Sequence, residues 1–399
     1  MDLFTKQILI APILILGLSG CGGSGELDNK ALGIGGNSAK IINQMSSGQY
    51  FVCAVVSGAA KCWGDNSYSQ LGNPSISSNS SALPVAVSGL TSGVQAIAAG
   101  SHHACAIVNG GVRCWGDNTY GQLGGGTLVK GQMSAQPVSI SGLESGVQAL
   151  AAGNNHTCAL SNGLVSCWGI DVEGQLGDNR QEYLSGHTGV VVQVTGLMPG
   201  IQAISAGGDS TCALASGKAF CWGMNGSGQV GTGLISPSSD VPVQVQGVPG
   251  AIEKISIGAD HACASTENGA YCWGDNSWGK LGNNSINSSA VPVRVQGFDS
   301  GVDAVEVGKN FSCGLAAGIL KCWGENDFGQ LGVSSMQLSN SMVPLQINGL
   351  MAGITEISIG YTSACVSDMG RMQCWGNNIY SQLGGAPTGE VKVVSIDGL

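Results

Sequence analysis

The chain has 399 residues, of which 43% are hydrophobic and only 10% are charged, and its formal net charge is −10. It is long enough to bury a large core, and 66 glycines with few aromatic residues besides eight tryptophans indicate many tight turns and favour an all-β fold. The acidic charge repels phosphate backbones and offers no counterion release, which argues against nucleic-acid binding.

The N-terminus has the pattern of an export signal. An eleven-residue apolar run, Ile8 to Leu18, follows Lys6 and ends three residues before Cys21. Such a run is too short to span a bilayer as a helix and is typical of a cleaved secretory signal. The segment Leu18–Cys21 resembles the lipobox of bacterial lipoproteins, which implies that residues 1–20 are a signal peptide and that the Cys21 thiol is acylated. An ordinary signal peptide with an incidental Cys, or a buried N-terminal strand, are the alternatives.

Residues 21–39 are Gly-rich and aperiodic, which predicts a flexible tether after the lipidated Cys21. Acylation would attach the protein to a membrane without crossing it. Gly22, in place of Asp, is what similar lipoproteins show when they are sent to the outer membrane. We therefore expect a lipid-anchored protein of the bacterial cell envelope, with the outer membrane favoured and either its periplasmic or its surface face possible.

One unit occurs seven times in residues 40–399. The tripeptide Cys-Trp-Gly recurs at steps of 50 to 54 residues, and another Cys precedes it by nine residues in every copy. A period near 50 residues predicts a propeller or a solenoid, which forms one body rather than several domains. The tripeptides begin at Cys62, Cys114, Cys167, Cys221, Cys272, Cys322 and Cys374.

Seven residues after each Trp comes Gln, or Lys280 in the fifth copy, followed by Leu or Val and then Gly. Written W-G-x-N-x-x-G-Q-L-G, the unit resembles the repeat of the regulator-of-chromosome-condensation family, and the match covers residues 41–399. The kelch pattern, a double Gly followed by a spaced Tyr and Trp, is absent, as is the WD dipeptide. The resemblance implies an all-β, seven-bladed β-propeller of four-stranded antiparallel blades, whose closure removes exposed sheet edges.

Each copy contains two short apolar segments joined by a Gly turn. In the second copy, Ala104–Val108 and Gly111–Trp115 flank Asn109-Gly110, which predicts a two-residue hairpin. Both faces of these segments are apolar because each blade would be packed between two neighbours. We expect the strand that begins near Ile41 to complete the blade begun by the C-terminal segment.

Fourteen of the fifteen cysteines form pairs nine residues apart. Across a two-residue turn such residues face each other as a non-hydrogen-bonded pair with Cα atoms about 4.5 Å apart, which suits a disulfide. Export would supply the oxidising compartment. We expect seven intrablade disulfides; buried free thiols and zinc binding are the alternatives, although no hairpin offers four zinc ligands. The pairs are Cys53/Cys62, Cys105/Cys114, Cys158/Cys167, Cys212/Cys221, Cys263/Cys272, Cys313/Cys322 and Cys365/Cys374.

Candidate chemistry is sparse. His103, His156 and His261 each lie two residues before the first Cys of their copies, and other copies have Phe or Ser there, so we interpret the position as structural, with a metal or catalytic role as the alternative. Acidic residues after Trp-Gly form a candidate ring, although Asp commonly hydrogen-bonds turn N–H groups at such positions. They are Asp65, Asp117, Asp275 and Glu325. No hydrolase, nucleotide-binding or metalloprotease motif occurs, so we expect no catalytic residue, metal or cofactor.

The copies differ most between Gln-Leu-Gly and the closing strand, where eight to thirteen residues intervene. The longest segment, Asp178 to Val190, contains the candidate partner-binding residues Arg180, Glu182, Tyr183 and His187. Loops on a rigid scaffold commonly carry binding, and Tyr and Arg are enriched at interface hot spots. Solvated connectors of drifting length are the alternative.

These features favour a protein-binding scaffold over an enzyme, as in the propeller-type β-lactamase inhibitory proteins of this architecture. Binding to polysaccharide or peptidoglycan is the alternative, followed by a hydrolase or lyase site at the channel mouth. The nucleotide-exchange activity of the family's best-known member is not expected, because this chain lacks the basic tail and the long wedge-like insertion. We expect a monomer with one membrane anchor and a protein partner that the sequence does not name.

Overall fold

The computed structural model describes residues 41–124, 131–180, 187–368, 370–396 and 398–399. The chain divides into the units Met1–Ala39 and Lys40–Leu399, and every described residue belongs to the second. The predictions for the signal peptide, Cys21 and the tether therefore lie outside the described residues, as do those for Glu182 and Tyr183. Within the described ranges, no helix has the length and apolarity needed to cross a membrane.

The described residues form seven four-stranded antiparallel sheets, each built from strands consecutive in the chain. Blade 1 consists of β1 (Ile42–Ser47), β2 (Phe51–Val56), β3 (Ala59–Asp65) and β4 (Ser80–Ala86). Blade 2 consists of β5 (Val94–Ala99), β6 (His103–Val108), β7 (Gly111–Gly116) and β8 (Ser134–Ser139). Blades 3 and 4 are β9 (Val147–Ala152), β10 (His156–Ser161), β11 (Leu164–Ile170), β12 (His187–Gln193), and β13 (Ile201–Gly207), β14 (Ser210–Ala215), β15 (Lys218–Met224), β16 (Ser238–Gln244). Blades 5 and 6 are β17 (Ile252–Ile257), β18 (His261–Thr266), β19 (Gly269–Gly274), β20 (Ser289–Arg294), and β21 (Val302–Val307), β22 (Phe311–Ala316), β23 (Ile319–Glu325), β24 (Asn340–Gln346). Blade 7 is β25 (Glu356–Ile359), β26 (Ser363–Ser367), β27 (Met372–Asn378) and β28 (Thr388–Ser395).

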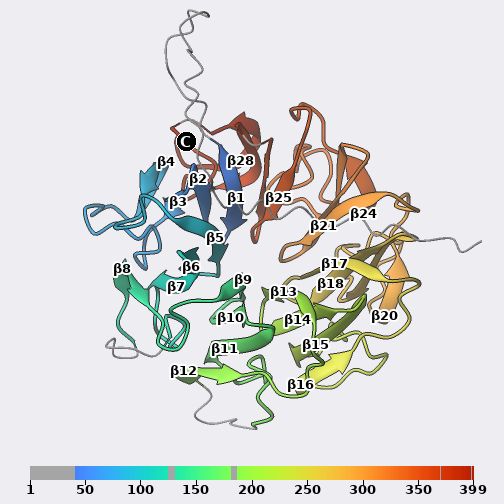
Figure 1. Cartoon of the computed structure of the whole chain (residues 1–399). Coiled ribbons are helices and arrows are strands. Elements are labelled where there is room, and N and C mark those ends of the chain that lie inside the picture. Colours follow the sequence, from blue (N-terminus) through green and yellow to red (C-terminus); the bar gives the residue numbers. More distant parts are fainter. Residues whose placement is uncertain (1–40, 125–130, 181–186, 369, 397) are drawn as a thin grey trace, which may run out of the picture. The chain divides into compact units, whose positions relative to one another are not determined.

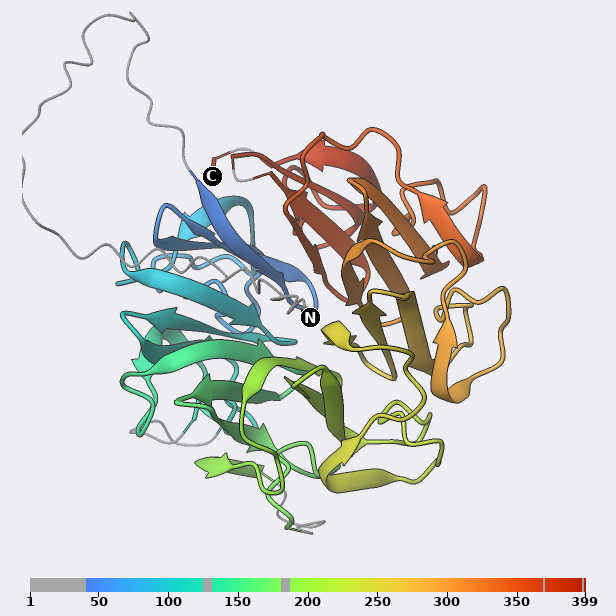
Figure 2. The same cartoon turned by 45° about the vertical axis from the view of Figure 1, so that its right-hand side comes forward.

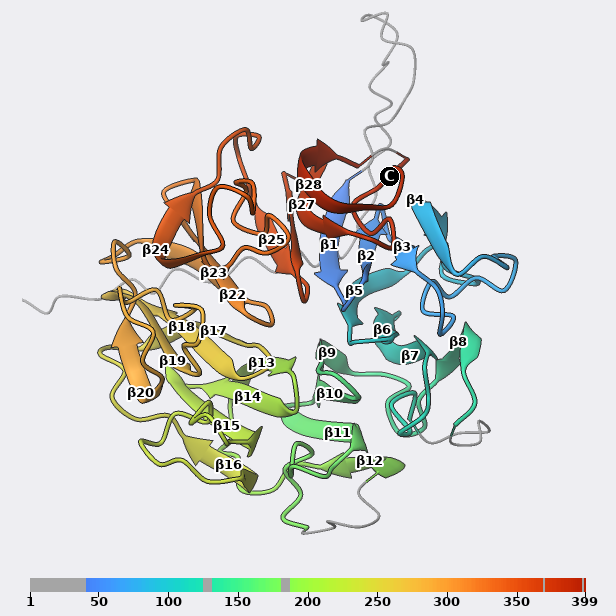
Figure 3. The same cartoon turned by 180° about the vertical axis from the view of Figure 1, so that it is seen from behind.

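The seven sheets are the blades of a propeller, which confirms the predicted fold (Figure 1). The first strand of each blade lies at the centre and contacts the first strands of its neighbours, with β1 against β25 closing the ring. The fourth strand of each blade lies on the perimeter. Neighbouring blades stack side by side around the ring in Figure 2, and Figure 3 shows the same order from behind.

Seven hydrophobic clusters fill the interfaces, one between each pair of neighbouring blades. All six residues of β2 are buried, because alternate side chains point into the cores on either side of the blade. Gly72 shows how tightly the blades approach: a Cβ there would lie 2.8 Å from the Trp115 ring of the next blade, and its φ of +65° also favours glycine. The apolar character of both faces of the hairpins is thus explained by blade-on-blade packing.

The ring closes differently from our expectation. β1 pairs with β2 inside blade 1, and β28 pairs with β27 inside blade 7, so no blade combines strands from both ends of the chain. The seam is closed by the interaction that joins all other blades, in which the Trp indole N–H donates to a main-chain carbonyl of the preceding blade. At the seam the Nε1 of Trp63 lies 2.9 Å from the Gln382 oxygen, and Trp115 makes the same bond to Gln70 at 2.9 Å.

A disulfide is present in every blade, between the second and third strands, at all seven predicted pairs. The Cα atoms of each pair are 4.0 to 4.1 Å apart. Most of the hairpins turn as expected through two residues with positive φ, such as Asn109 at 52° and Gly110 at 82°, the geometry of a type I′ turn.

The perimeter strands begin earlier than the apolar pattern suggests. In blade 1 the alternating apolar residues of Pro84 to Leu90 indicate the fourth strand, but β4 runs from Ser80 to Ala86. Ser80 pairs with Asp65, and Ser81 pairs with Gly64, before the register shifts. A strand with one face in water accepts Ser, so its first residues carry no hydrophobic signal.

Candidate functional site

The strand directions place two kinds of connection on opposite faces of the propeller. The loop face consists of the turns between the first and second strands, such as Gly48–Tyr50, and the loops between the third and fourth strands, such as Asn66–Asn79. The hairpin face consists of the turns between the second and third strands, such as Ser57–Gly58, and the connections between blades. The loops that vary most among the seven copies all belong to the loop face.

The Asn of W-G-x-N anchors these variable loops, a role that the motif alone did not reveal. In blade 5 the Nδ2 of Asn276 donates to the carbonyls of Ser285 and Asn287, both at 2.9 Å, while its Oδ1 accepts from the Leu281 N–H at 2.9 Å. Asn66, Asn225, Asn326 and Asn378 make equivalent bonds. Blade 3 has Asp171 at this position, and a carboxylate has no N–H to donate.

The acidic residues after Trp-Gly serve mainly in turns, as predicted. The Oδ1 of Asp65 accepts from both the N–H and the hydroxyl of Ser67, and its Oδ2 accepts from the Gln70 amide at 2.7 Å. Asp117 makes the same set of bonds in blade 2. Both side chains are almost completely buried, so these two carboxylates do not form an accessible acidic ring.

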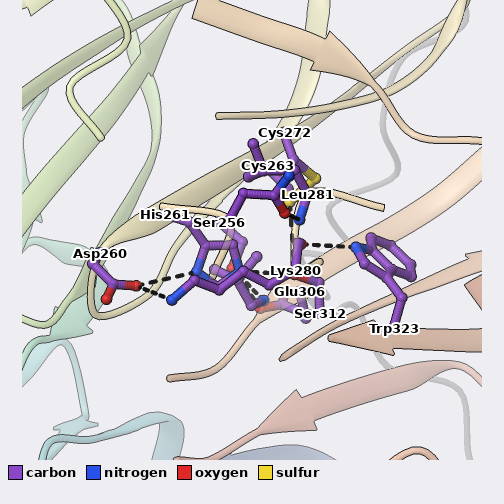
Figure 4. Close-up of a disulfide and its surroundings, with 12 residues drawn as sticks. Ser256, Asp260, His261, Cys263, Cys272, Lys280, Leu281, Glu306, Ser312 and Trp323 are labelled. Atoms are coloured by element: carbon purple, nitrogen blue, oxygen red, sulfur yellow. Dashed lines mark hydrogen bonds and ion pairs between the residues drawn. A yellow bond between two sulfur atoms is a disulfide. The ribbon is translucent and has the colours of Figure 1, made fainter. Parts of the chain in front are cut away.

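Blade 5 departs from the pattern, because the fully buried Lys280 replaces Gln (Figure 4). Its ammonium lies 2.6 Å from Asp260 Oδ1, 2.7 Å from Asp275 Oδ2 and 3.1 Å from Asn310 Oδ1. All three ammonium donors are therefore used. Burial opposes ionisation of both carboxyl groups, but His261 and the charge of Lys280 hold the pKa of Asp260 below its usual value, and the hydrogen bond and charge of Lys280 do the same for Asp275.

Ser312, His261 and Asp260 lie together beside Lys280, but they do not form an accessible catalytic triad. Ser312 Oγ donates to the Lys280 carbonyl at 3.0 Å, so the His261 Nε2, 2.8 Å from that hydroxyl, must donate to it. A catalytic base would instead accept the serine proton. Both side chains are completely buried, and burial, opposed in part by Asp260, lowers the pKa of His261.

The other two histidines of this position make matching bonds. His103 Nε2 lies 2.8 Å from the Thr157 hydroxyl, and His156 Nε2 lies 2.8 Å from the Thr211 hydroxyl of the next blade. Burial lowers the pKa of His103 to about 4 and that of His156 to about 3. The same histidine–hydroxyl hydrogen bond occurs at three blade interfaces, which indicates a structural role for these histidines. Within the described ranges, no group of three or more His, Cys, Asp or Glu could hold a metal ion.

The innermost strands line a central channel, in which a polar cavity of about 250 Å³ contains two carboxyl groups. Burial raises the pKa of Glu306 to about 7, and burial together with the Glu306 charge raises the pKa of Glu356 to about 7. Ser256 Oγ donates to Glu306 at 2.9 Å. Towards the loop face the channel is crossed by Tyr361, whose hydroxyl donates to Asn154 of blade 3.

Among the described residues of the loops, the most exposed aliphatic side chains lie on the loop face of three consecutive blades. Leu234 and Ile235 in blade 4 are 71% and 68% exposed, Ile286 in blade 5 is 60% exposed, and Met336 in blade 6 is 98% exposed. We call these four residues the aliphatic arc. Backbone bonds tie the loops to the following blades, as between the Gly233 N–H and the Ala290 carbonyl at 2.9 Å. Clusters of exposed apolar residues on a rigid surface commonly mark interaction sites.

The predicted partner-binding loop of copy three is only partly described. Arg180 is exposed and lies 3.4 Å from Asp178 in an ion pair. We expected His187 to lie in the loop, but it is the first residue of β12 and pairs with Ile170. The aliphatic arc was missed because single apolar residues within Ser- and Asn-rich segments have no periodicity.

Known proteins share both the repeat and the fold. A family model, the regulator of chromosome condensation (RCC1) repeat, matches residues 58–107, 109–160, 216–265, 267–315 and 318–366. The ultraviolet-B receptor UVR8 of Arabidopsis thaliana is 34% identical over 196 residues, which is 47% of this chain and 42% of the receptor. The human E3 ubiquitin-protein ligase HERC2 is 30% identical over 280 residues, covering 67% of this chain and 6% of the ligase. The chain thus spans less than half the length of these relatives.

Among solved structures, human WBSCR16 superposes with a TM-score of 0.74 and 20% identity over 85% of this chain and 93% of that one. Prp20p from Saccharomyces cerevisiae, described with its binding properties to Gsp1p and histones, superposes with a TM-score of 0.73 and 21% identity over 90% of this chain and 88% of that one. At these identities the likeness concerns the fold.

Proposed function

Because the chain belongs to the regulator of chromosome condensation (RCC1) repeat family, we propose that it is a non-enzymatic scaffold of the bacterial cell envelope that binds a protein partner through its loop face. The aliphatic arc carries the proposal, since Leu234, Ile286 and Met336 expose large apolar side chains on one face of three adjacent blades. Among proteins of similar fold, yeast RCC1 (Prp20) is described with Gsp1p and histones and in a complex with Kap60.

The rigidity of the arc supports a binding role. In each of the three blades an Asn side chain hydrogen-bonds loop carbonyls, and Asn326 bonds the carbonyls of Val333 and Leu338 on both sides of Met336 at 3.1 and 2.7 Å. A loop already held in place loses little conformational entropy when a partner binds. The apolar side chains are thus presented in a preorganised arrangement.

Site-specific photocrosslinking in intact cells tests the binding role. A photoreactive residue in place of Ile286 or Met336 should crosslink one recurrent protein. Leu164, 54% exposed on the hairpin face, is the matched control position and should not capture that protein. The Ile235→Asp variant, in the neighbouring blade, should reduce the crosslink at position 286.

Equal crosslinking from both faces, or none from the arc, would overturn the proposal. Retention of the purified protein on peptidoglycan, lost in an Ile286→Asp, Met336→Asp variant, would instead favour polysaccharide binding.

Acylation is tested separately by metabolic labelling with an alkyne fatty acid. The wild-type protein should incorporate the label and fractionate with membranes, because the acyl chains partition into the bilayer. The Cys21→Ser variant should lose both properties. Labelling that persists in this variant would contradict the assignment of Cys21.

A further inference from the structure

A second feature of the loop face indicates the chemistry of the partner. The residue two positions before the Gln or Lys of each copy is aromatic in blades 5, 6, 7, 1 and 2, which are consecutive around the ring, and is Glu173 or Ser227 in blades 3 and 4. We call the five aromatic residues the aromatic crescent. They are Trp278, Phe328, Tyr380, Tyr68 and Tyr120.

The crescent is partly exposed and held rigidly. Tyr68 is 40% exposed and the other four are half-buried. The main-chain N–H groups of Tyr68, Tyr120 and Phe328 each donate to the Gln side chain two residues later at 2.8 Å. Two of the rings also have an aromatic neighbour, since Tyr68 lies 4.5 Å from His102 and Tyr380 lies 4.9 Å from Tyr50. The backbone that carries these rings is therefore held in place, and neighbouring rings restrain Tyr68 and Tyr380.

The surroundings of the crescent are acidic. Among side chains that the structure describes in these five blades, the loop face has six acidic residues and two lysines. One of the lysines, Lys280, is enclosed by two of the acids. The acids are Asp65, Asp117, Asp260, Asp275, Glu325 and Asp327. Several are satisfied by internal hydrogen bonds, but their charge still contributes to the potential above the face.

The protein itself places a cation on an aromatic ring of this face. The Lys309 ammonium lies 5.6 Å from the centre of the Tyr361 ring, beside the channel mouth. Attraction between a cation and the face of an aromatic ring is strongest where water is partly excluded. The crescent offers five further partly buried aromatic rings on the same face.

We propose that the aromatic crescent binds Lys and Arg side chains of the partner protein, while the aliphatic arc contacts an adjoining apolar patch on it. The inference rests on the proposed function and adds to it the charge of the partner. Arc and crescent overlap in blades 5 and 6, so one partner surface with an apolar centre and a basic border fits both. The net charge of −10 would steer such a partner towards the propeller.

Binding of a fluorescent hexa-arginine peptide to the full-length protein, measured by anisotropy at two salt concentrations, tests the proposal. A variant with Tyr68→Ala, Tyr120→Ala and Tyr380→Ala should bind the peptide about 10- to 100-fold more weakly, since three cation–π contacts are removed. The matched variant with Tyr68→Phe, Tyr120→Phe and Tyr380→Phe keeps the ring faces and should bind as the wild type does. Circular dichroism and thermal unfolding show whether each variant is folded.

Equal binding by the alanine variant would assign the peptide affinity to net charge alone and would overturn the proposal. Failure of the wild type to bind the peptide would overturn it as well. If the alanine variant fails to fold, crosslinking at position 286 in the otherwise wild-type protein replaces it as the test. Free hexa-arginine should inhibit this crosslinking, whereas hexa-glutamate should not. Crosslinking that hexa-arginine does not inhibit would overturn the proposal. Partner crosslinks at Ile286 that persist while hexa-arginine does not bind would retain the protein-binding function and reject only the basic partner. Loss of retention on a neutral oligosaccharide in the alanine variant, without peptide binding, would replace the proposal with sugar stacking.

Discussion

At the residue scale, position 280 shows how one substitution alters a repeated interface. In blades 1 and 2 the Gln amide at this position donates to a single Asp. Lys280 instead holds Asp260 and Asp275, which come from two different segments of blade 5, and Asn310 from blade 6. A buried lysine is tolerated only when it is fully paired, and here it neutralises carboxylates that would otherwise repel each other.

We expect Lys280→Met to lower the free energy of unfolding by up to about 3 kcal/mol, because it leaves the partly buried Asp260 and Asp275 without their charge partner. Lys280→Gln is the matched control, since it restores the residue of the other six copies and keeps two amide donors, and it should cost clearly less. Urea unfolding measures both. A Lys280→Met variant as stable as the wild type would show that Asp260 and Asp275 are neutral or solvated in the folded protein.

At the element scale, the loops depend on one Asn each, and the blades depend on one Trp each. Asn276 bonds two carbonyls of its loop, whereas blade 3 has Asp171 and cannot form these bonds. The Trp of each Cys-Trp-Gly donates its indole N–H to the preceding blade at 2.8 or 2.9 Å, including Trp63 across the seam. Ring closure therefore depends on a Trp that recurs in all seven copies, and loop anchoring on an Asn that recurs in six of them.

The Asn276→Asp variant tests the anchoring of the blade-5 loop. Loss of the two Nδ2 hydrogen bonds should lower the free energy of local opening of this loop by about 1–3 kcal/mol. Hydrogen exchange over residues 279–290 should therefore become faster, with little change in the melting temperature. The blade-6 loop held by Asn326 is the control within the same molecule. Unchanged exchange in the blade-5 loop would contradict the anchoring role.

The seam between blades 7 and 1 should be as strong as an internal interface. We expect Trp63→Phe and Trp115→Phe to lower the unfolding free energy by similar amounts, about 1–3 kcal/mol each, because each leaves a Gln carbonyl without its indole donor. Thermal unfolding of the two variants is the measurement. A cost at Trp115 with none at Trp63 would mean that the ring is open at the seam in solution.

At the scale of the whole molecule, two sets of titratable groups make the free energy of unfolding depend on pH in opposite directions. The raised pKa of Glu306 and of Glu356, about 7 each, stabilises the folded state below about pH 4.5, and this contribution is lost as the pH rises to about 7. The lowered pKa values of His103 and His156, about 4 and about 3, stabilise it above about pH 6.5, and this contribution is lost as the pH falls towards those values.

The Glu306→Gln, Glu356→Gln variant isolates the first set. Its unfolding free energy, relative to the wild type, should increase as the pH rises from about 4.5 to about 7, because only the wild type must then ionise two carboxyl groups in the channel. Urea unfolding at several pH values measures the difference. Glu267→Gln, on the exposed hairpin face, is the control and should show no such trend. A pH-independent difference for the channel variant would place both carboxyl groups in contact with bulk water.

The amino-acid sequence determined the repeat, the seven blades and the cysteine pairing by itself, because these depend on local spacing: a turn of two residues aligns Cys105 with Cys114 whatever surrounds them. Only the tertiary structure decided which side chains from different blades meet. The hydrogen bonds of Trp63 to Gln382 and of Lys280 to Asn310 join residues about 320 and about 30 positions apart in the chain, and the arrangement of the blades puts the exposed Leu234, Ile286 and Met336 on one face. Such contacts carry no periodic signal, since they arise from the packing of one complete blade against the next.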